Sequence, residues 1–203
     1  MYLYNSERNL LCQVIKNLWE RRLTNASGGN LSIRLSDSQI LITPTLMAEN
    51  KFCALEPQDL LVIDYEGNLL DGNGGLSRET SMHTGLYKEF DSVNAVIHAH
   101  PFNCMPFAAF ESPIESFTEA TNMQGSVELI EQAEMCTPEL TANVISYYKE
   151  RETILKKYAV AGIMPKHGIV VAGQNVNKAY AYLECIECDA YCALSSGYFA
   201  DKK

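Results

Sequence analysis

Three pairs of short apolar segments, each pair joined by a polar turn, constrain the fold more than any other feature of this sequence. Residues 31–35 and 40–44 flank the turn Ser-Asp-Ser-Gln, residues 60–64 and 69–72 flank Tyr-Glu-Gly-Asn, and residues 158–164 and 169–173 flank Pro-Lys-His-Gly. Strands joined by such short connections pair as antiparallel neighbours. The sequence therefore predicts a sheet that contains several antiparallel hairpins.

Helical periodicity lies between these pairs. Apolar residues recur at helical spacing after Ser6, a candidate cap, as far as residues 21–23, and again over 77–90, where Ser77 is placed to cap and Met82, Leu86 and Phe90 share one stripe. A third helix is expected from the cap Thr137 to about residue 157, and a last one over 175–196. Residues 94–101 read as a buried strand, and 106–135 as a mixture of short strand and loop.

Helices and strands that alternate in this way indicate one α/β unit. A central, partly antiparallel sheet covered by helices on both faces is the expected architecture. The 203 residues suit a single domain that spans residues 1–203.

Composition excludes several functions. The formal net charge of −9 argues against nucleic-acid binding, which needs a basic surface. The N-terminus carries charges throughout and does not read as a signal peptide, and no apolar run approaches the roughly 20 residues of a membrane helix. Without an export signal, the seven cysteines are expected to be reduced, which predicts a cytoplasmic protein.

The histidines form the main candidate site. On a strand, His98 and His100 point to the same face, so both imidazoles can bind one metal ion. The alternative is that each imidazole only forms a hydrogen bond to a carbonyl group in the core. His167, in the last predicted turn, can supply a third nitrogen, as in a catalytic zinc site. Glu79 lies in the first helical turn, where it serves either as a base or only as a partner of the helix dipole, and His83 shares its helix face.

Six motifs together give a family resemblance. They are GGNLS (28–32), ITPT (42–45), LSRETSMH (76–83), VIHAHP (96–101), TPEL (137–140) and PKHGIVVAG (165–173). In this order the segments resemble the class II aldolase/adducin family over about residues 7–195. The resemblance implies a three-layer α/β/α sandwich and a cyclic homotetramer with active sites at its subunit interfaces.

The resemblance also implies roles for individual residues. One Zn²⁺ per chain is expected on His98, His100 and His167, with Glu79 as the catalytic acid/base and His83 as its support. Burial is expected to raise the pKa of Glu79 once substrate displaces it from the metal. The segments that match the family's phosphate site contain Gly29, Asn30, Thr43, Thr45, Ser77 and Arg78.

The implied function is that of a zinc-dependent lyase. It cleaves a small ketose 1-phosphate, similar to fuculose phosphate, to dihydroxyacetone phosphate and an aldehyde through a metal-stabilised enediolate. Alternatives that stay open are a methylthioribulose-phosphate dehydratase, a ribulose-phosphate epimerase, a decarboxylase that uses Arg78 on a carboxylate, and a non-catalytic, adducin-like scaffold. Arg78 stands where many aldolases of the family have serine, and their tyrosine acid has no counterpart before Thr137; Tyr198 is a weak substitute.

Overall fold

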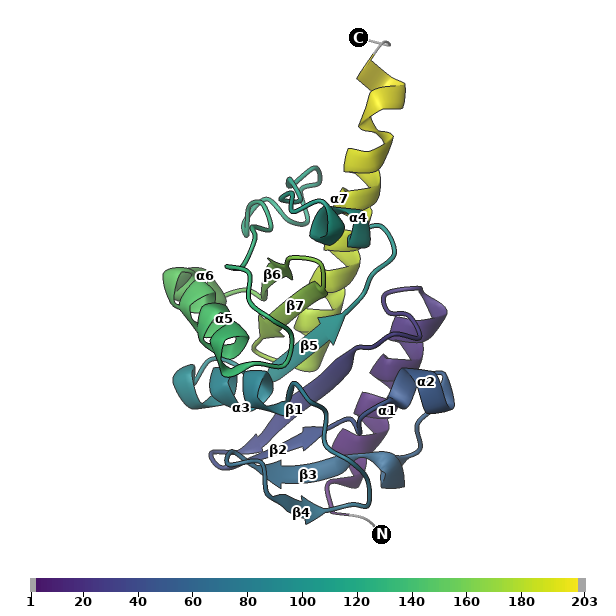
Figure 1. The fold of residues 1–203 in the computed structure, drawn as a ribbon, viewed down its shortest axis with the longest axis vertical. Coiled ribbons are helices and arrows are strands. Elements are labelled where there is room, and N and C mark those ends of the chain that lie inside the picture. Colours follow the sequence, from purple (N-terminus) through teal and green to yellow (C-terminus); the bar gives the residue numbers. More distant parts are fainter. Residues whose placement is uncertain (1–2, 201–203) are drawn as a thin grey trace.

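A single seven-stranded sheet forms the centre of the structure, a computed structural model that describes residues 3–200 and the side chains up to residue 197. The strand order is β4-β3-β2-β1-β5-β7-β6, and every ladder in it is antiparallel (Figure 1). The strands are β1 (Asn30–Ser36), β2 (Gln39–Ile42), β3 (Leu61–Asp64), β4 (Leu69–Asp71), β5 (Ala95–Ala99), β6 (Val160–Met164) and β7 (Gly168–Gly173). The three predicted hairpins are confirmed as β1–β2, β3–β4 and β6–β7.

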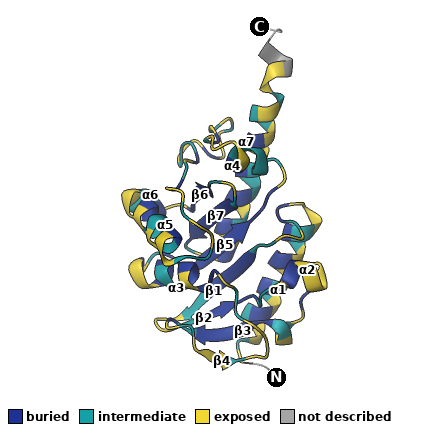
Figure 2. Ribbon diagram, viewed as in Figure 1, coloured by how far each residue is buried: buried dark blue, intermediate teal, exposed yellow. Residues whose placement is uncertain are grey.

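Helices cover both faces of the sheet, so the predicted α/β fold class is confirmed. One face packs against α1 (Asn5–Glu20) and α7 (Val176–Ala200), and the other against α3 (Thr80–Glu89), α5 (Pro138–Glu150) and α6 (Glu152–Leu155). The sheet between these layers is almost wholly buried (Figure 2). Short helices α2 (Met47–Lys51), η1 (Pro57–Asp59) and α4 (Met105–Ala109) lie in the connections. Within residues 3–200, no helix combines the length and apolarity needed to cross a bilayer.

The two-residue period of β5 decides where its functional side chains point. Ala95, Ile97 and Ala99 belong to the apolar cluster under α1 and α7, whereas Val96 belongs to the cluster under α3 and α5. Because alternate side chains share a face, His98 projects to the same face as Val96, beside the N-terminus of α3. The strand pattern thus brings an imidazole to the helix end that carries Glu79.

Two helix starts differ from the predictions. Ser6 does not cap α1: the N-cap is Tyr4, in the left-handed region at φ 59°, and the Ser6 hydroxyl donates instead to Glu7. Ser77 does not cap α3 either, since Glu79 is the N-cap and Ser77 Oγ accepts a bond from the Glu79 N–H at 3.2 Å. Glu79 therefore stands just before the first turn of α3, not within it.

The third predicted helix begins as expected and ends early. Thr137 is the N-cap of α5, where its side chain accepts a bond from the Leu140 N–H. The helix stops at residue 150, because Arg151 leaves helical geometry at φ −111°, ψ 12°, and the short α6 follows. The segment 106–135, expected to be strand and loop, is mostly loop with two isolated bridges, but it also contains most of α4.

Candidate metal centre and active site

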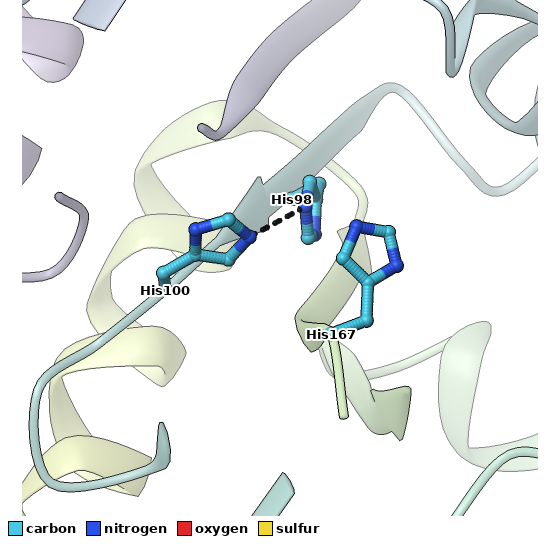
Figure 3. A group of neighbouring side chains, drawn as sticks. All are labelled: His98, His100 and His167. Atoms are coloured by element: carbon cyan, nitrogen blue, oxygen red, sulfur yellow. Dashed lines mark hydrogen bonds between the residues drawn. The ribbon is translucent and has the colours of Figure 1, made fainter. Parts of the chain in front are cut away.

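Three imidazoles meet at one end of β5 and β7. His98 lies in β5, His100 directly follows that strand, and His167 directly precedes β7, which pairs with β5 (Figure 3). One ligand nitrogen from each histidine lies within 4.8 Å of the other two. The structure therefore brings together the three histidines that the sequence selected, from segments nearly 70 residues apart.

Hydrogen bonds fix which nitrogens face the centre of this group. His98 Nδ1 lies 3.0 Å from the Ile169 carbonyl oxygen, so it carries the proton and donates. His100 Nδ1 faces Ser27 Oγ and Asn25 Oδ1 at 3.2 and 3.3 Å. The two Nε2 atoms then point at each other across 3.1 Å. Two unprotonated nitrogens at that separation repel unless a proton or a cation lies between them, which is the arrangement of a metal-binding pair.

The protonation states also suit a metal. Burial, with the neighbouring His98 and His167, lowers the pKa of His100 to about 3. Burial and the neighbouring His98 lower the pKa of His167 to about 4. Both side chains are therefore neutral near pH 7, the form in which imidazole binds a metal ion.

Glu79 completes the group from the side of α3. Its Oε2 lies 3.4 Å from His98 Nε2, and its Oε1 lies 3.2 Å from His167 Nε2. Burial raises the pKa of Glu79, but His98, a hydrogen bond from Asn30 and His167 together outweigh burial, so the pKa is lowered. The carboxylate is therefore charged at neutral pH in this structure, and the rise expected when substrate is bound stays a prediction.

Two buried polar atoms in this group lack hydrogen-bond partners. Glu79 Oε1 and His167 Nδ1 are both shielded from solvent and make no hydrogen bond. Buried polar atoms are normally satisfied, and an unsatisfied one at a cluster of ligand-type side chains indicates a missing partner. A metal ion near Glu79 Oε1 and the three imidazoles fits these residues.

Two glycines make room for the imidazoles. A Cβ on Gly168 would lie 2.5 Å from His100 Cδ2 and 2.7 Å from the Ala99 carbonyl oxygen, and a Cβ on Gly28 would lie 2.9 Å from His100 Cε1. No side chain fits at either position without moving the ring. The glycines in the motifs GGNLS and PKHG therefore position His100.

A cavity of about 280 Å³ opens over the histidines and Glu79. Of the residues predicted to bind phosphate, those that line this cavity are Gly29, Asn30, Thr45, Ser77 and Arg78. Thr43 is not among the residues that line it: its side chain is fully buried, and its Oγ1 accepts a bond from the Leu31 N–H. His83 is also fully buried and lies behind Asn30, bonded to Asn30 Oδ1.

Several residues at this cavity were not among the predicted site residues, including four with polar or reactive side chains. Asn25 and Ser27 contact His100, and Lys166 and Cys136 line the cavity. The loop Asn-Ala-Ser-Gly-Gly, which contains Asn25 and Ser27, and the position of Lys166 beside His167 could have indicated three of them. No sequence pattern indicates that Cys136 lies at the same cavity as Glu79. The prediction for Tyr198 falls on a side chain outside the described residues.

Taken together, the antiparallel sheet covered by helices and the three imidazoles beside a carboxylate have the features of an α/β enzyme with a metal site. The chain belongs to the class II aldolase and adducin family, because residues 9–194 match the family described as "Class II Aldolase and Adducin N-terminal domain". The family resemblance drawn from six motifs is thereby confirmed.

The relatives differ in the reactions that their names give. An L-fuculose phosphate aldolase of Methanococcus maripaludis is 31% identical over 84% of this chain and 86% of its own length. A 3-oxo-tetronate 4-phosphate decarboxylase of Haemophilus influenzae is 29% identical over 90% of this chain and 84% of its own length. A methylthioribulose-1-phosphate dehydratase of Pectobacterium atrosepticum is 27% identical over 94% of each chain.

Solved structures support the same fold. An L-fuculose 1-phosphate aldolase superposes with a TM-score of 0.81 at 26% sequence identity, over 98% of this chain and 89% of that chain. Because the relatives include an aldolase, a decarboxylase and a dehydratase, the comparisons define an enzyme family that acts on sugar phosphates without fixing one reaction.

Proposed function

We propose that this protein is a zinc-dependent lyase that cleaves a small ketose 1-phosphate, of the fuculose phosphate type, to dihydroxyacetone phosphate and an aldehyde. The observation that carries the proposal is Glu79, whose two carboxylate oxygens lie 3.4 Å from His98 Nε2 and 3.2 Å from His167 Nε2. A charged carboxylate beside a three-imidazole site can move a proton on a substrate held there. The aldolase relative at 31% identity supports this choice of reaction.

The residues of the cavity have three different roles in the proposed reaction: metal binding, proton transfer and phosphate binding. A bound zinc ion would be held by His98, His100 and His167 and would supply the Lewis acid that draws electrons from the substrate carbonyl. In the cleavage direction the charged Glu79 carboxylate takes the proton that the substrate hydroxyl loses as it becomes the aldehyde, and it delivers a proton to the carbon left by the broken carbon–carbon bond. The guanidinium of Arg78 and the hydroxyl of Ser77 at the cavity wall bind the phosphate, for which a guanidinium offers two parallel hydrogen bonds.

Product analysis tests the reaction. Zinc-loaded protein is incubated with a panel of ketose 1-phosphates, and triose phosphate release is followed by an enzymatic assay. We expect release of dihydroxyacetone phosphate, and a fall in kcat of about 10²-fold to 10⁴-fold for Glu79→Ala, as for loss of a general acid–base group. Full cleavage activity in Glu79→Ala would remove Glu79 from its role. A wild-type protein that binds no metal and releases no product would favour the non-catalytic scaffold.

Decarboxylation is the second candidate function, because of Arg78. This side chain is exposed at the cavity and makes no hydrogen bond or ion pair within the part of the chain that the structure describes. A free guanidinium next to Glu79 can hold a substrate carboxylate, and the relative at 29% identity is named a decarboxylase. Carbon dioxide release from a phosphorylated keto acid, lost in Arg78→Ser, would favour this reaction over cleavage.

We also propose that the enzyme is a cytoplasmic homotetramer. Exposed apolar side chains at Phe102, Phe110, Tyr191 and Leu194 support self-association, since large exposed apolar residues favour protein contacts. All seven cysteines are free, which supports a reducing compartment. Light scattering coupled to gel filtration tests the assembly, and a monomer at micromolar concentration would contradict it. Cell fractionation tests the location.

A further inference from the structure

Behind the carboxylate of Glu79, a chain of buried hydrogen bonds runs away from the cavity. Asn30 Nδ2 lies 2.7 Å from Glu79 Oε2, and Asn30 Oδ1 lies 2.5 Å from His83 Nε2. His83 Nδ1 lies 2.6 Å from Ser32 Oγ, which in turn lies 2.8 Å from the Tyr87 hydroxyl. Five side chains from β1, α3 and the residue before α3 thus form one continuous chain, and His83 and Ser32 are fully buried.

The charged end of this chain fixes the direction of every bond. A carboxylate only accepts, so the Asn30 amide must turn its NH₂ group to Glu79 and its oxygen to His83. His83 must then carry its proton on Nε2 and accept at Nδ1. Ser32 must donate to Nδ1, which leaves its oxygen to accept from the Tyr87 hydroxyl. The chain therefore runs Tyr87 → Ser32 → His83 → Asn30 → Glu79.

The side-chain amide of Asn30 has no N–H donor left for a substrate phosphate. Its NH₂ group donates to Glu79 Oε2 and, at 3.2 Å, to Ser77 Oγ, while its oxygen accepts from His83. Its backbone belongs to β1, opposite His98 in β5. A side chain with these bonds holds Glu79, and a contact of the Asn30 side-chain N–H groups with phosphate would require the bonds to Glu79 or Ser77 to break.

The two oxygens of Glu79 consequently differ. Oε2 accepts from Asn30, whereas Oε1 is buried without a hydrogen bond and lies 3.2 Å from His167 Nε2. Both oxygens lie beside an imidazole, Oε2 at 3.4 Å from His98 Nε2, but only Oε2 is anchored by a hydrogen bond. A carboxylate anchored at one oxygen presents the other in a fixed direction, which is the preorganisation that proton transfer needs.

We propose that His83, Ser32 and Tyr87 are positioning residues that act through Asn30 to hold Glu79 Oε2, so that Oε1 is the oxygen that exchanges the proton with substrate. The assignment of proton transfer to Glu79 rests on the proposed function, but the chain itself does not. Apolar side chains could fill the same space without needing hydrogen-bond partners. A continuous chain of five hydrogen-bonded polar side chains in their place therefore indicates a functional role.

The first test determines the direction of these hydrogen bonds by NMR and needs no enzymatic reaction. Protein labelled with ¹⁵N in its four histidines and loaded with zinc is studied by NMR at pH 7.5, and His83→Gln identifies the signals of His83 by their loss. We expect neutral His83 with the proton on Nε2. We also expect Tyr87→Phe to shift the His83 Nδ1 signal, whereas Tyr148→Phe leaves it unchanged. A proton on Nδ1 would reverse the chain and overturn the proposal.

Tyr148 is a suitable control because its hydroxyl is also hydrogen-bonded but does not belong to the chain of hydrogen bonds that ends at Glu79. It is also fully buried, and its hydroxyl bonds the carbonyl oxygens of Val160 and Val170. Loss of either hydroxyl therefore removes a buried hydrogen bond, so a general loss of stability would affect both variants alike.

The second test is kinetic and uses whichever product the panel identifies. His83→Met removes the donor to Asn30 and should lower kcat about 10-fold to 100-fold, as for loss of other outer-shell partners, with KM and zinc content unchanged. His83→Gln, whose amide can donate to Asn30, should recover most of kcat. Equal losses in the two variants would overturn the positioning role.

A variant that does not fold leaves the kinetic test intact. Tyr87→Phe and Tyr148→Phe then replace the His83 pair, and we expect kcat to fall only in Tyr87→Phe. If no sugar phosphate reacts, the proposed function fails while the NMR result still decides the direction of the chain.

Discussion

The two faces of the central sheet are built from different kinds of contact. Towards α1 and α7, β5 places Ile97 in the same apolar cluster as Leu11 and Leu183, so this face is held mainly by hydrophobic burial. Towards α3, the same strand places His98 beside Glu79, and β1 places Ser32 beside His83. Polar groups buried on this second face are stabilised by their hydrogen-bond partners, although Glu79 Oε1 has none. Both faces contain an apolar cluster, and the alternation of strand side chains separates the polar groups of the site onto the second face alone.

The largest effect expected from this separation is loss of the metal. Replacement of both His98 and His100 by alanine removes two of the three imidazoles, so zinc content should fall from about one per chain to almost none. Far-ultraviolet circular dichroism should stay unchanged, because neither residue packs in the apolar clusters. Elemental analysis of untagged protein makes the measurement, with Thr84→Val, a buried polar residue of α3, as the control. Metal retained in the double variant would place the site elsewhere.

A pair of leucines on opposite faces sharpens the comparison. Leu183 in α7 and Leu86 in α3 are both fully buried, so replacement of either by alanine should lower the free energy of unfolding by about 3 kcal/mol. Leu86 lies between His83 and Tyr87 in α3, so only Leu86→Ala should also lower kcat. Urea unfolding and steady-state kinetics at 20 °C separate the two effects. An equal loss of kcat in both variants would mean that the faces are not separate.

Much of this arrangement could be predicted from the sequence because it depends on local pattern. The polar turns specified the hairpins, the cap at Thr137 specified the start of α5, and the spacing of His98 and His100 placed both imidazoles on one face. Local pattern failed at Ser6, because Tyr4 begins α1 in a left-handed conformation.

The hydrogen-bond chain could not be predicted because its links are long-range. Asn30 and His83 are 53 residues apart, and only the packing of α3 on β1 brings them together. The prediction for Thr43 had the same weakness. Its motif suggested phosphate binding, but the pairing of the strands places its hydroxyl against the Leu31 backbone N–H. Pairing partners across a sheet depend on topology, which motifs do not encode.

A smaller effect is expected from the glycine that packs on His100. In Gly168→Ala, the new methyl group would lie 2.5 Å from His100 Cδ2 and 2.7 Å from the Ala99 carbonyl oxygen, so the ring must move. We expect zinc affinity to fall about 10-fold to 100-fold, as for other losses of ligand support. Competition with a fluorescent chelator measures it. Gly74→Ala, whose methyl group would meet nothing closer than 3.6 Å, should bind zinc normally. Unchanged affinity in Gly168→Ala would show that the ring tolerates displacement.

The smallest expected effect is a decrease in the free energy of unfolding at acidic pH, caused by His83 on the polar face. Burial lowers the pKa of His83 to about 3, against an ordinary value of 6.5. Between these values the unfolded chain binds a proton that the folded chain lacks, so the free energy of unfolding decreases as the pH falls below 6.5. From pH 7 to pH 5.5, His83 should account for about 1 kcal/mol of this decrease.

Comparison with His83→Gln isolates this contribution. Urea unfolding of the metal-free protein at pH 7 and pH 5.5 should give a smaller decrease for the variant, because glutamine does not titrate. His100 and His167, whose pKa values are also lowered, contribute to both proteins and cancel in the difference. Leu183→Ala, on the apolar face, should be less stable at both pH values yet keep the wild-type pH dependence. Equal decreases in wild type and His83→Gln would mean that His83 accepts a proton without unfolding, and the polar face would then be less tightly closed than its hydrogen bonds indicate.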